Sequence, residues 1–386
     1  MTNSAIQAMK RPKKAEVISN RKLGPMDLPF FLLVLLVMCF GLIMMFSASY
    51  ASALYTMDNS AYYFIKQGLI ALGGTAVMLV ISRMNYQYLR ALSIPMLIAA
   101  LVLLILVPII GFDAGGATRW IKVGPVQLQP SEVAKFAVIV SFSSMISVFR
   151  EKMKTFKYGI LPFAVVLVVI AALMLWQPHI SGAILIVVVG GALMFVGGVH
   201  WGWFAGAIAV AVVVGYFVMT NMAHAITRIR VWQDPFSDPQ GGGYQIIQSL
   251  YAVGSGGLFG LGLGKSRQKH LYLPEQHNDF IFAIVCEELG MVGACLVLFL
   301  FALLIIRGYW IAIRSRDRFG SLMVTGIITL LAVQTFLNVA VVTNLIPVTG
   351  ISLPFFSYGG TSLLIQLAEM GVVLSVSRQI PAPRAG

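Results

Sequence analysis

Charged residues are scarce in this chain: they make up only 11% of its 386 residues, and hydrophobic residues make up 59%. Soluble globular domains carry about 25% charged residues, so this composition excludes that class and indicates a polytopic membrane protein. Acidic residues are the scarcest, with 14 against 27 lysines and arginines and a net charge of +13. In a soluble chain that excess would suggest a nucleic-acid partner. Here the cations lie mainly in short segments between apolar runs, as the positive-inside rule predicts, so we expect no nucleic-acid partner.

Cysteine is almost absent, and the three cysteines (Cys39, Cys286 and Cys295) all lie inside apolar runs. This excludes a disulfide framework and any zinc-binding spacing. The chain also lacks a soluble domain, an internal repeat and a low-complexity tract. We therefore expect a single membrane domain.

The apolar runs predict an all-α fold of about ten transmembrane helices, each long enough to cross a bilayer. The first run, Leu28–Phe46, is too long for a cleaved signal peptide. The expected spans are residues 27–49, 61–82, 88–111, 131–149, 158–176, 181–199, 201–221, 279–306, 319–345 and 360–378. We expect a basic cytoplasmic tail over residues 1–26, a membrane domain over 27–378 and a cytoplasmic tail over 379–386.

Lysine and arginine residues indicate how the chain is oriented in the membrane, because they concentrate in the N-terminal tail and in alternate links between the spans. Both termini are therefore predicted to be cytoplasmic. Two substantial loops then face outward, at residues 112–130 and at residues 222–278, the longest link. Within the second loop, Tyr244–Val253 has helical periodicity and predicts an interfacial or re-entrant helix.

Asp279 is the main candidate for chemistry, because it stands where the polar loop ends and an apolar run begins. A carboxylate at the mouth of a membrane helix is costly unless it is hydrated or paired, so such residues are functional candidates. The alternative is a helix cap, since aspartate is favoured at the positive end of a helix. Position alone leaves both interpretations open.

Upstream of Asp279, residues 254–264 contain six glycines and lead into Lys265. A nucleotide-binding P-loop is excluded, because the pattern requires glycine where Phe259 stands and a preceding strand. The glycines predict either close backbone approach to a bulky ligand or a turn-rich linker. Lys265, Arg267 and Lys269 alternate with polar residues, and they predict a phosphate clamp or a solvated charge run.

Four potential ligands, His270, Glu275, His277 and Asp279, lie within ten residues. Their spacing matches no established metal-binding pattern, so we expect no resident metal. A transient Mg²⁺ or Mn²⁺ bridging Asp279 and a pyrophosphate is a separate alternative.

The first outer loop leads into a helix that begins near Pro130 and Ser131. Glu132 and Lys135 share a face of its first turn, which fits either a snorkelling pair or the lining of a polar cavity. Late in the chain, NLIPVTGISLPFFSYGGTS cannot form one regular helix, and such backbone is tolerated at membrane depth only against protein or a wet cavity.

Four segments, QPSEVAKF, GGGYQIIQSLYAVGSGGLFG, GLGKSRQKHLYLPEQHNDFIFAIVCEELG and PVTGISLPFFSYGG, closely resemble the SEDS family (shape, elongation, division and sporulation), and in particular its division and sporulation branches. The resemblance covers about residues 27–378. It implies a peptidoglycan glycosyltransferase that polymerises lipid II at the outer face of the cytoplasmic (inner) membrane of a bacterium. It also implies a cognate class B penicillin-binding protein and other divisome membrane proteins as partners, with enrichment at the septum.

The same resemblance implies the roles of individual residues. The catalytic aspartate of the family falls on Asp279. The expected substrate-binding residues are Arg119, Trp120, Glu132, Lys135, Lys265, Gln268, Lys269 and His277. The chain departs from the family after its second Gln-Pro, where many members carry aspartate and this chain has His179. The resemblance gives His179 no role.

Two other classes of function compete with this interpretation. A lipid II flippase would use a charged path at the membrane midplane and commonly repeated halves, but the polar residues concentrate on the predicted outer side. A non-catalytic scaffold for a transpeptidase would not need a carboxylate at the loop–helix junction, although the sequence does not exclude it.

Overall fold

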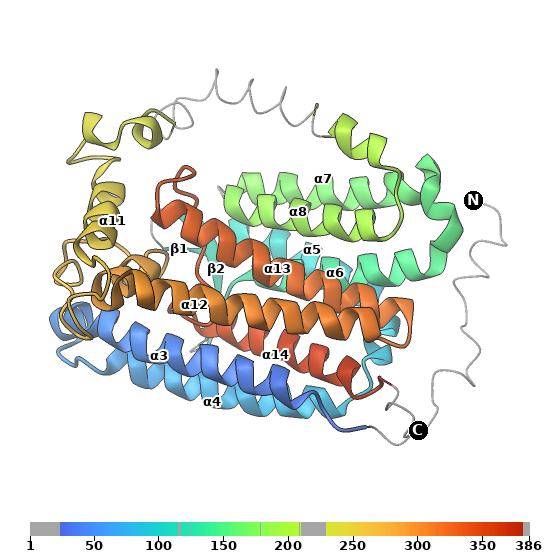
Figure 1. Ribbon diagram of the computed structural model, residues 1–386. Helices are drawn as coiled ribbons and strands as arrows, with labels where there is room; N and C mark the ends of the chain where they lie inside the picture. The colour runs from blue at the N-terminus through green and yellow to red at the C-terminus, as the bar shows by residue number, and fades with distance from the viewer. Residues whose placement is uncertain are drawn as a thin grey trace.

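The protein is a bundle of long apolar helices that run roughly parallel, with its longest described loop (yellow) at one end and shorter links at the other (Figure 1). The computed structural model describes residues 24–114, 117–124, 126–177, 179–207, 209 and 229–380. Within these residues, eight helical segments are long and apolar enough to cross a membrane, and one shorter apolar helix accompanies them. The chain is therefore a multi-pass helical membrane protein.

The long helices are α3 (Leu28–Met57), α4 (Tyr62–Arg83), α5 (Gln87–Ile110), α6 (Pro130–Phe149), α7 (Leu161–Trp176), α12 (Ile281–Arg314), α13 (Arg318–Val342) and α14 (Gly360–Ser377), and the shorter one is α8 (Ile180–Val196). A 3₁₀ helix, η1 (Arg150–Lys154), and a π-helix, η2 (Phe156–Ile160), join α6 to α7. Each of the α-helices named here coincides with a predicted span. The remaining predicted span, residues 201–221, lies mostly outside the described residues.

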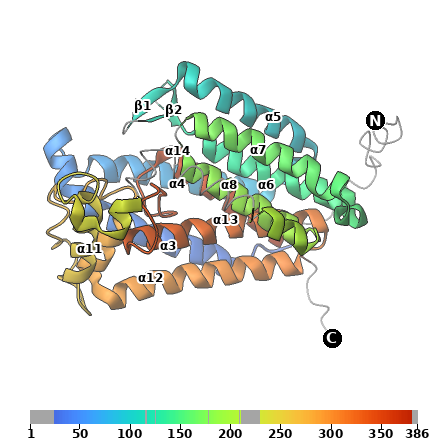
Figure 2. The same ribbon diagram turned by 90° about the horizontal axis from the view of Figure 1, so that it is seen from above.

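Local sequence signals explain where several helices begin. The Asp27 side chain accepts a hydrogen bond from the backbone N–H of Phe30 at 2.9 Å and so caps α3. Proline occupies the first turn of α3, α6 and α7, where its missing N–H costs nothing. Seen from above, α5 and α12 lie on opposite sides of the bundle, with α13 and α14 between them (Figure 2).

The first outer loop forms a small antiparallel sheet that the sequence analysis did not predict. Its strands are β1 (Phe112–Ala114), β2 (Ala117–Val123) and β3 (Val126–Leu128), in the order β1-β2-β3. The strands are too short to leave a clear alternating pattern in the sequence. The Thr361 hydroxyl of α14 donates to the Gln127 carbonyl at 2.8 Å, which ties the sheet to the bundle.

The long loop before α12 contains a short 3₁₀ helix, η3 (Pro235–Ser237), and the amphipathic helix α11 (Tyr244–Ser255). The predicted helical piece at residues 244–253 is therefore confirmed as a helix. α11 buries Ile246, Ile247 and Ala252 against the bundle, and its partner helices include α12 and α13. It lies at the loop end of the molecule in Figure 1.

Helix α12 breaks at Gly290, whose φ of 67° and ψ of −168° are not helical. The glycine-rich segment 256–262 lies against this break. The amides of Leu261 and Gly262 donate to the carbonyls of Glu287 and Glu288 at 3.0 Å. In return, the amides of Met291 and Val292 donate to the carbonyls of residues 257 and 258 at 2.9 and 3.1 Å. Two segments thus exchange the hydrogen bonds that an unbroken helix would have made internally.

The glycines of this segment make the contact sterically feasible. A Cβ on Gly260, which has a φ of +77°, would lie 2.2 Å from the Glu288 carbonyl oxygen. A Cβ on Gly256 would lie 1.9 Å from the Cys286 carbonyl oxygen. We expected close backbone approach to a ligand or a linker, but what the glycines approach here is the protein's own broken helix.

The two ends of the described chain meet at the end of the bundle away from the longest described loop. The Gly24 amide donates to the Arg378 carbonyl at 2.9 Å, and the Asp27 amide donates to the Ser377 hydroxyl at 3.1 Å. Arg307 adds an ion pair to Asp27 at 2.7 Å. The two ends of the described chain therefore lie on the same side of the bundle.

Candidate functional site

Asp279 lies directly before α12, at the loop end of the bundle. The Asn338 side-chain amide of α13 donates to the Asp279 carbonyl and to the Ile351 carbonyl, each at 2.7 Å. Beside it, the Ser357 hydroxyl donates to the Asn278 carbonyl at 2.7 Å. The loop before α12 is thereby fastened to the irregular segment between α13 and α14, which explains why that segment contains proline and glycine rather than a regular helix.

Gly350 of this irregular segment lies close to the carboxylate of Asp279. A Cβ built on Gly350 would lie 3.3 Å from Asp279 Oδ2, and the φ of Gly350 is +68°, a conformation that favours glycine. Gly350 is also one of the residues that line a pocket, whereas Asp279 is not. Gly350 therefore lies close to both the Asp279 carboxylate and the pocket.

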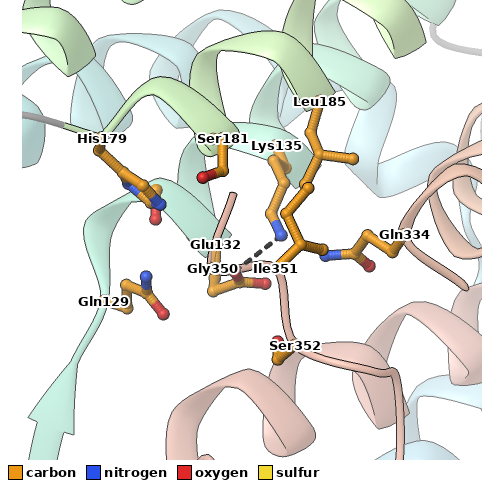
Figure 3. A pocket seen from close by; sticks show the side chains of 12 residues that line it. Gln129, Glu132, Lys135, His179, Ser181, Leu185, Gln334, Gly350, Ile351 and Ser352 are labelled. Carbon is orange, nitrogen blue, oxygen red and sulfur yellow. Dashed lines mark ion pairs between the residues drawn. The ribbon is translucent and has the colours of Figure 1, made fainter. Parts of the chain in front are cut away.

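The pocket is polar and small (Figure 3). The centres of water molecules can occupy about 40 Å³ of it, enough for a few waters at roughly 10–15 Å³ each. Its lining residues come from four parts of the chain: Gln129, Ser131, Glu132, Lys135, His179, Ser181, Gly182, Leu185, Gln334, Gly350, Ile351 and Ser352. Lys135 Nζ and Glu132 Oε1 form an ion pair of 2.7 Å, drawn as the dashed line in Figure 3.

Two buried polar atoms of the pocket residues lack a hydrogen-bond partner among the described residues: Ser131 Oγ and His179 Nδ1. The His179 ring lies against Gly182, where an added Cβ would come within 2.8 Å of it. The Ser181 hydroxyl donates to the Thr349 carbonyl and joins α8 to the irregular segment. Because buried polar groups are normally satisfied, these atoms point to a pocket that takes water or a polar ligand group.

The electrostatic setting of Asp279 suits a base. Burial, with the Glu275 carboxylate nearby, raises the pKa of Asp279 to about 6, while the opposing charge of Arg119 lowers it. A carboxyl group with a pKa nearer neutrality is a better proton acceptor and is still mostly ionised at neutral pH.

Arg119 lies on β2 and brings the first outer loop to the site. Its positive charge acts on Asp279 and on His179. Burial, together with Arg119 and Lys135, lowers the pKa of His179 to about 3, so this imidazole is neutral. Trp120 is half-buried on the same strand and pairs with Phe112. The structure thus brings the charges of Arg119 and Lys135 close to the loop that carries Asp279.

The residues expected to form a phosphate clamp differ in how far their side chains are exposed. Lys265 and Arg267 are exposed, and Gln268 is half-buried. Lys269 is buried, and its Nζ forms an ion pair of 2.9 Å with Glu288 while donating to the Ser47 hydroxyl at 3.2 Å. Lys269 therefore departs from the expected clamp, because its ammonium group is already paired inside the protein.

Sequence reasoning missed the two carboxylates that hold this region. Glu287 accepts from the Arg267 amide at 2.9 Å and from the Ser266 hydroxyl. Glu288 accepts from the Ser47 hydroxyl at 2.7 Å as well as from Lys269. The available signal was the adjacent acid pair in the apolar run after Asp279, since acids inside a span need partners.

His277 is held among aromatic residues. Its ring stacks on Tyr63 with centroids 4.9 Å apart, and its carbonyl accepts from the Tyr358 amide at 2.9 Å. Burial lowers the pKa of His277, against the opposing effect of Glu275. Among the described residues, no group of three or more His, Cys, Asp and Glu side chains could hold a metal ion.

The sequence is similar to a known protein family and to named members of it. The family model of the FtsW, RodA and SpoVE cell cycle proteins matches residues 27–381. The chain belongs to this family. The probable peptidoglycan glycosyltransferase FtsW of Geobacter metallireducens is 38% identical over 356 residues, which cover 92% of this chain and 95% of that protein. The stage V sporulation protein E of Bacillus subtilis is 40% identical over 365 residues, covering 94% of this chain and 99% of that protein.

Solved structures agree with the FtsW, RodA and SpoVE assignment. One chain of a peptidoglycan synthase complex, described for coordinating polymerization and crosslinking, aligns with a TM-score of 0.78 and 29% identity, covering 92% of this chain and 98% of that one. The rod shape determining protein RodA of Thermus thermophilus aligns with a TM-score of 0.69 and 26% identity, covering 93% and 98% of the two chains. The resemblance inferred from the sequence motifs is thereby confirmed.

Proposed function

We propose that this chain is a peptidoglycan glycosyltransferase that polymerises lipid II into glycan strands during cell division, with Asp279 as general base. The observation that carries the proposal is the position of the Asp279 carboxylate, just before α12 and close to Gly350, which lines a polar pocket. Burial raises the pKa of Asp279 to about 6, which supports the same role. Family membership and the glycosyltransferase names of similar proteins support the reaction class.

In the proposed reaction, the carboxylate of Asp279 takes the proton of an acceptor sugar hydroxyl. The oxygen of that hydroxyl forms a bond to the anomeric carbon of the donor, whose bond to the polyprenyl pyrophosphate breaks. The departing pyrophosphate carries the electron pair away, so the products are a longer glycan, a polyprenyl pyrophosphate and a protonated Asp279. General-base catalysis of this kind contributes roughly 10²–10⁴-fold.

The cations near Asp279 are suited to the departing pyrophosphate. Arg119 acts electrostatically on Asp279, and Lys135 lies in the pocket beyond Gly350. Fixed positive charges that meet developing negative charge stabilise the transition state without reorganisation. Glu132 holds Lys135 in place at 2.7 Å. Trp120, Lys265, Gln268 and His277 stay proposed substrate contacts.

A divalent cation would have limited protein ligands here. Mg²⁺ is commonly held by one or two carboxylates together with substrate phosphates. Asp279, with the charge of Glu275 nearby, fits the first part of that arrangement. When bound, Mg²⁺ or Mn²⁺ would neutralise charge on the pyrophosphate.

We infer ten spans, with cytoplasmic tails at 1–26 and 379–386 around a membrane domain at 27–378. Gly24 and Arg378 meet on the same side of the bundle, which agrees with an even number of crossings such as ten. Cation-rich links favour cytoplasmic termini and an outward loop at 222–278. By analogy with the peptidoglycan synthase complex, the proposed partner is a class B penicillin-binding protein, alongside other divisome proteins at the septum.

The decisive experiment is polymerisation of purified lipid II, with and without the cognate transpeptidase. Asp279→Asn should lower glycan synthesis by roughly 10²-fold or more while transpeptidase binding persists. Asp234→Asn is the matched control. Asp234 is an exposed aspartate in the same loop, and its side chain caps η3. Near-normal polymer from Asp279→Asn would remove Asp279 from the mechanism and favour a flippase or scaffold.

A further inference from the structure

Two arginines and one tryptophan form a stack at the opposite end of α12 from Asp279. The guanidinium carbons of Arg307 and Arg314 lie 4.0 and 4.1 Å from the centre of the Trp310 ring. The three residues are spaced at helical intervals, so they share one face of α12. Tryptophan and arginine at the end of a membrane helix are typical of the depth at which lipid headgroups lie. The proposed function uses none of these residues.

The two guanidinium groups differ in how their charges are compensated. Arg307 donates to both carboxylate oxygens of Asp27, at 3.0 and 2.7 Å. Arg314 is exposed, and no carboxylate among the described residues forms an ion pair with it. Like charges on one ring repel each other, and Asp27 balances only one of the two. The stack therefore carries one uncompensated positive charge.

The acid that follows α12 in the sequence does not balance this charge. The Asp317 carboxylate accepts from the Tyr86 hydroxyl, and from the Gln87 side-chain amide at 3.2 Å. On either side of it, Arg316 and Arg318 are exposed and add positive charge. An anion from outside the protein would be attracted here, and guanidinium groups recognise phosphate oxygens strongly.

Exposed apolar side chains run along the same helix face beside the stack. Ile306 and Ile313 expose 65% and 83% of their surfaces. Helical spacing places both isoleucines on one side of Trp310 and both arginines on the other. A ligand that matches both sides of the ring has a phosphate group and an apolar chain, whereas free phosphate would match only the arginines.

We propose that this face of α12 is a binding site for an anionic phospholipid. The Arg314 guanidinium binds the headgroup phosphate, and Ile306 and Ile313 contact an acyl chain. The ion pair with Asp27 holds Arg307 against the Trp310 ring, so binding has to order little more than the Arg314 side chain. The site is independent of the proposed function, because it lies at the far end of α12 from the general base.

Titration of the purified protein in detergent with short-chain phosphatidylglycerol tests the site directly. Native mass spectrometry counts the bound lipid at each concentration and gives a Kd. Arg314→Gln should raise this Kd roughly tenfold or more, the loss expected for a hydrogen bond between charged groups. Trp310→Leu removes the ring that orients both guanidinium groups and should raise the Kd roughly threefold. Inorganic phosphate should not displace the lipid.

Arg316→Gln is the matched control, because Arg316 is an exposed arginine two residues after Arg314 and outside the stack. It should leave the Kd within about twofold. Equal losses in Arg314→Gln and Arg316→Gln would show diffuse attraction and overturn the site, and so would an unchanged Kd in Arg314→Gln. Equal affinity for zwitterionic phosphatidylcholine, or displacement of the lipid by inorganic phosphate, would also overturn it. If Trp310→Leu unfolds, the exposed Arg314 decides the result.

Discussion

The carboxylate of Asp279 is set for proton transfer by its neighbours rather than by its own chemistry. Burial and Glu275 raise its pKa, and Arg119 opposes them. Gly350 contributes because it lacks a side chain, since a Cβ at this position would lie 3.3 Å from Asp279 Oδ2. Both conditions can be altered one residue at a time.

The first prediction concerns pH. A base must be ionised, and with a pKa of about 6 for Asp279, the polymerisation rate should fall roughly tenfold per pH unit below 6 and level off above it. Glu275→Gln removes a negative neighbour that raises this pKa, so the inflection should move to lower pH. Initial rates between about pH 4.5 and 8 measure both profiles. An inflection that stays unchanged in Glu275→Gln would contradict the assignment of the titration to Asp279.

The second prediction concerns Gly350→Ala. The new Cβ would lie 3.3 Å from Asp279 Oδ2 at a φ of +68°, so it should displace the carboxylate and strain the backbone. We expect kcat to fall roughly tenfold or more, since small displacements of a catalytic group are costly. Gly359→Ala is the control from the same segment, because its added Cβ would meet only Ser362 at an ordinary 3.5 Å. Equal activity of the two variants would show that the close contact at Gly350 is unimportant.

Among the elements, the broken helix α12 and the glycine-rich segment 256–262 form one structural unit. Their exchanged hydrogen bonds fix the start of the loop that ends at Asp279, and the Lys269–Glu288 ion pair reinforces this from within at 2.9 Å. A buried ion pair is strongly destabilising to break, because it leaves one charge uncompensated. The unit therefore depends on steric fit as well as on charge.

The third prediction tests that fit by thermal unfolding in detergent. Gly260→Ala should lower the free energy of unfolding by about 1–3 kcal/mol, because its φ of +77° and a 2.2 Å approach to the Glu288 carbonyl exclude a Cβ. Gly254→Ala is the control: nothing lies within 4 Å of its added Cβ, and Gly254 lies in α11. Alanine there should be neutral or slightly stabilising. Similar unfolding midpoints for both variants would mean that the glycine-rich segment does not stabilise the break in α12.

Which elements the sequence could predict follows from how each is encoded. The long helices were predictable because apolar length is a strong local signal. The three-stranded sheet was not, because its strands have at most seven residues and depend on contacts such as Thr361 with Gln127. Asp279 and the Glu132–Lys135 pair stood out as charges in apolar surroundings. Gly350 beside Asp279, and the pairing of Lys269 with Glu288, are tertiary contacts that no local pattern contains.

At the scale of the whole molecule, the fourth prediction concerns orientation. Helix α11 lies at one end of the bundle and the last turns of α14 at the other (Figure 1). Asp279 lies between α11 and the start of α12, and Gly24 hydrogen-bonds to Arg378 directly after α14. A reporter fused near Gln240 should therefore read as outside, and one near Lys154 as inside. Alkaline phosphatase and green fluorescent protein fusions at both positions measure this. A cytoplasmic reading near Gln240 would place Asp279 on the wrong side for lipid II.

The contact between α4, the second long helix, and α14 has a consequence for biogenesis. α14 packs extensively against α4. A Cβ on Gly371 would come within 2.7 Å of the Met78 carbonyl, and Gly74 faces Leu367 in the same way at 2.5 Å. Among the described helices α14 comes last in the chain. Helix α4 therefore lacks this close-packed partner until α14 has entered the membrane, so we expect this part of the bundle to close only after that step.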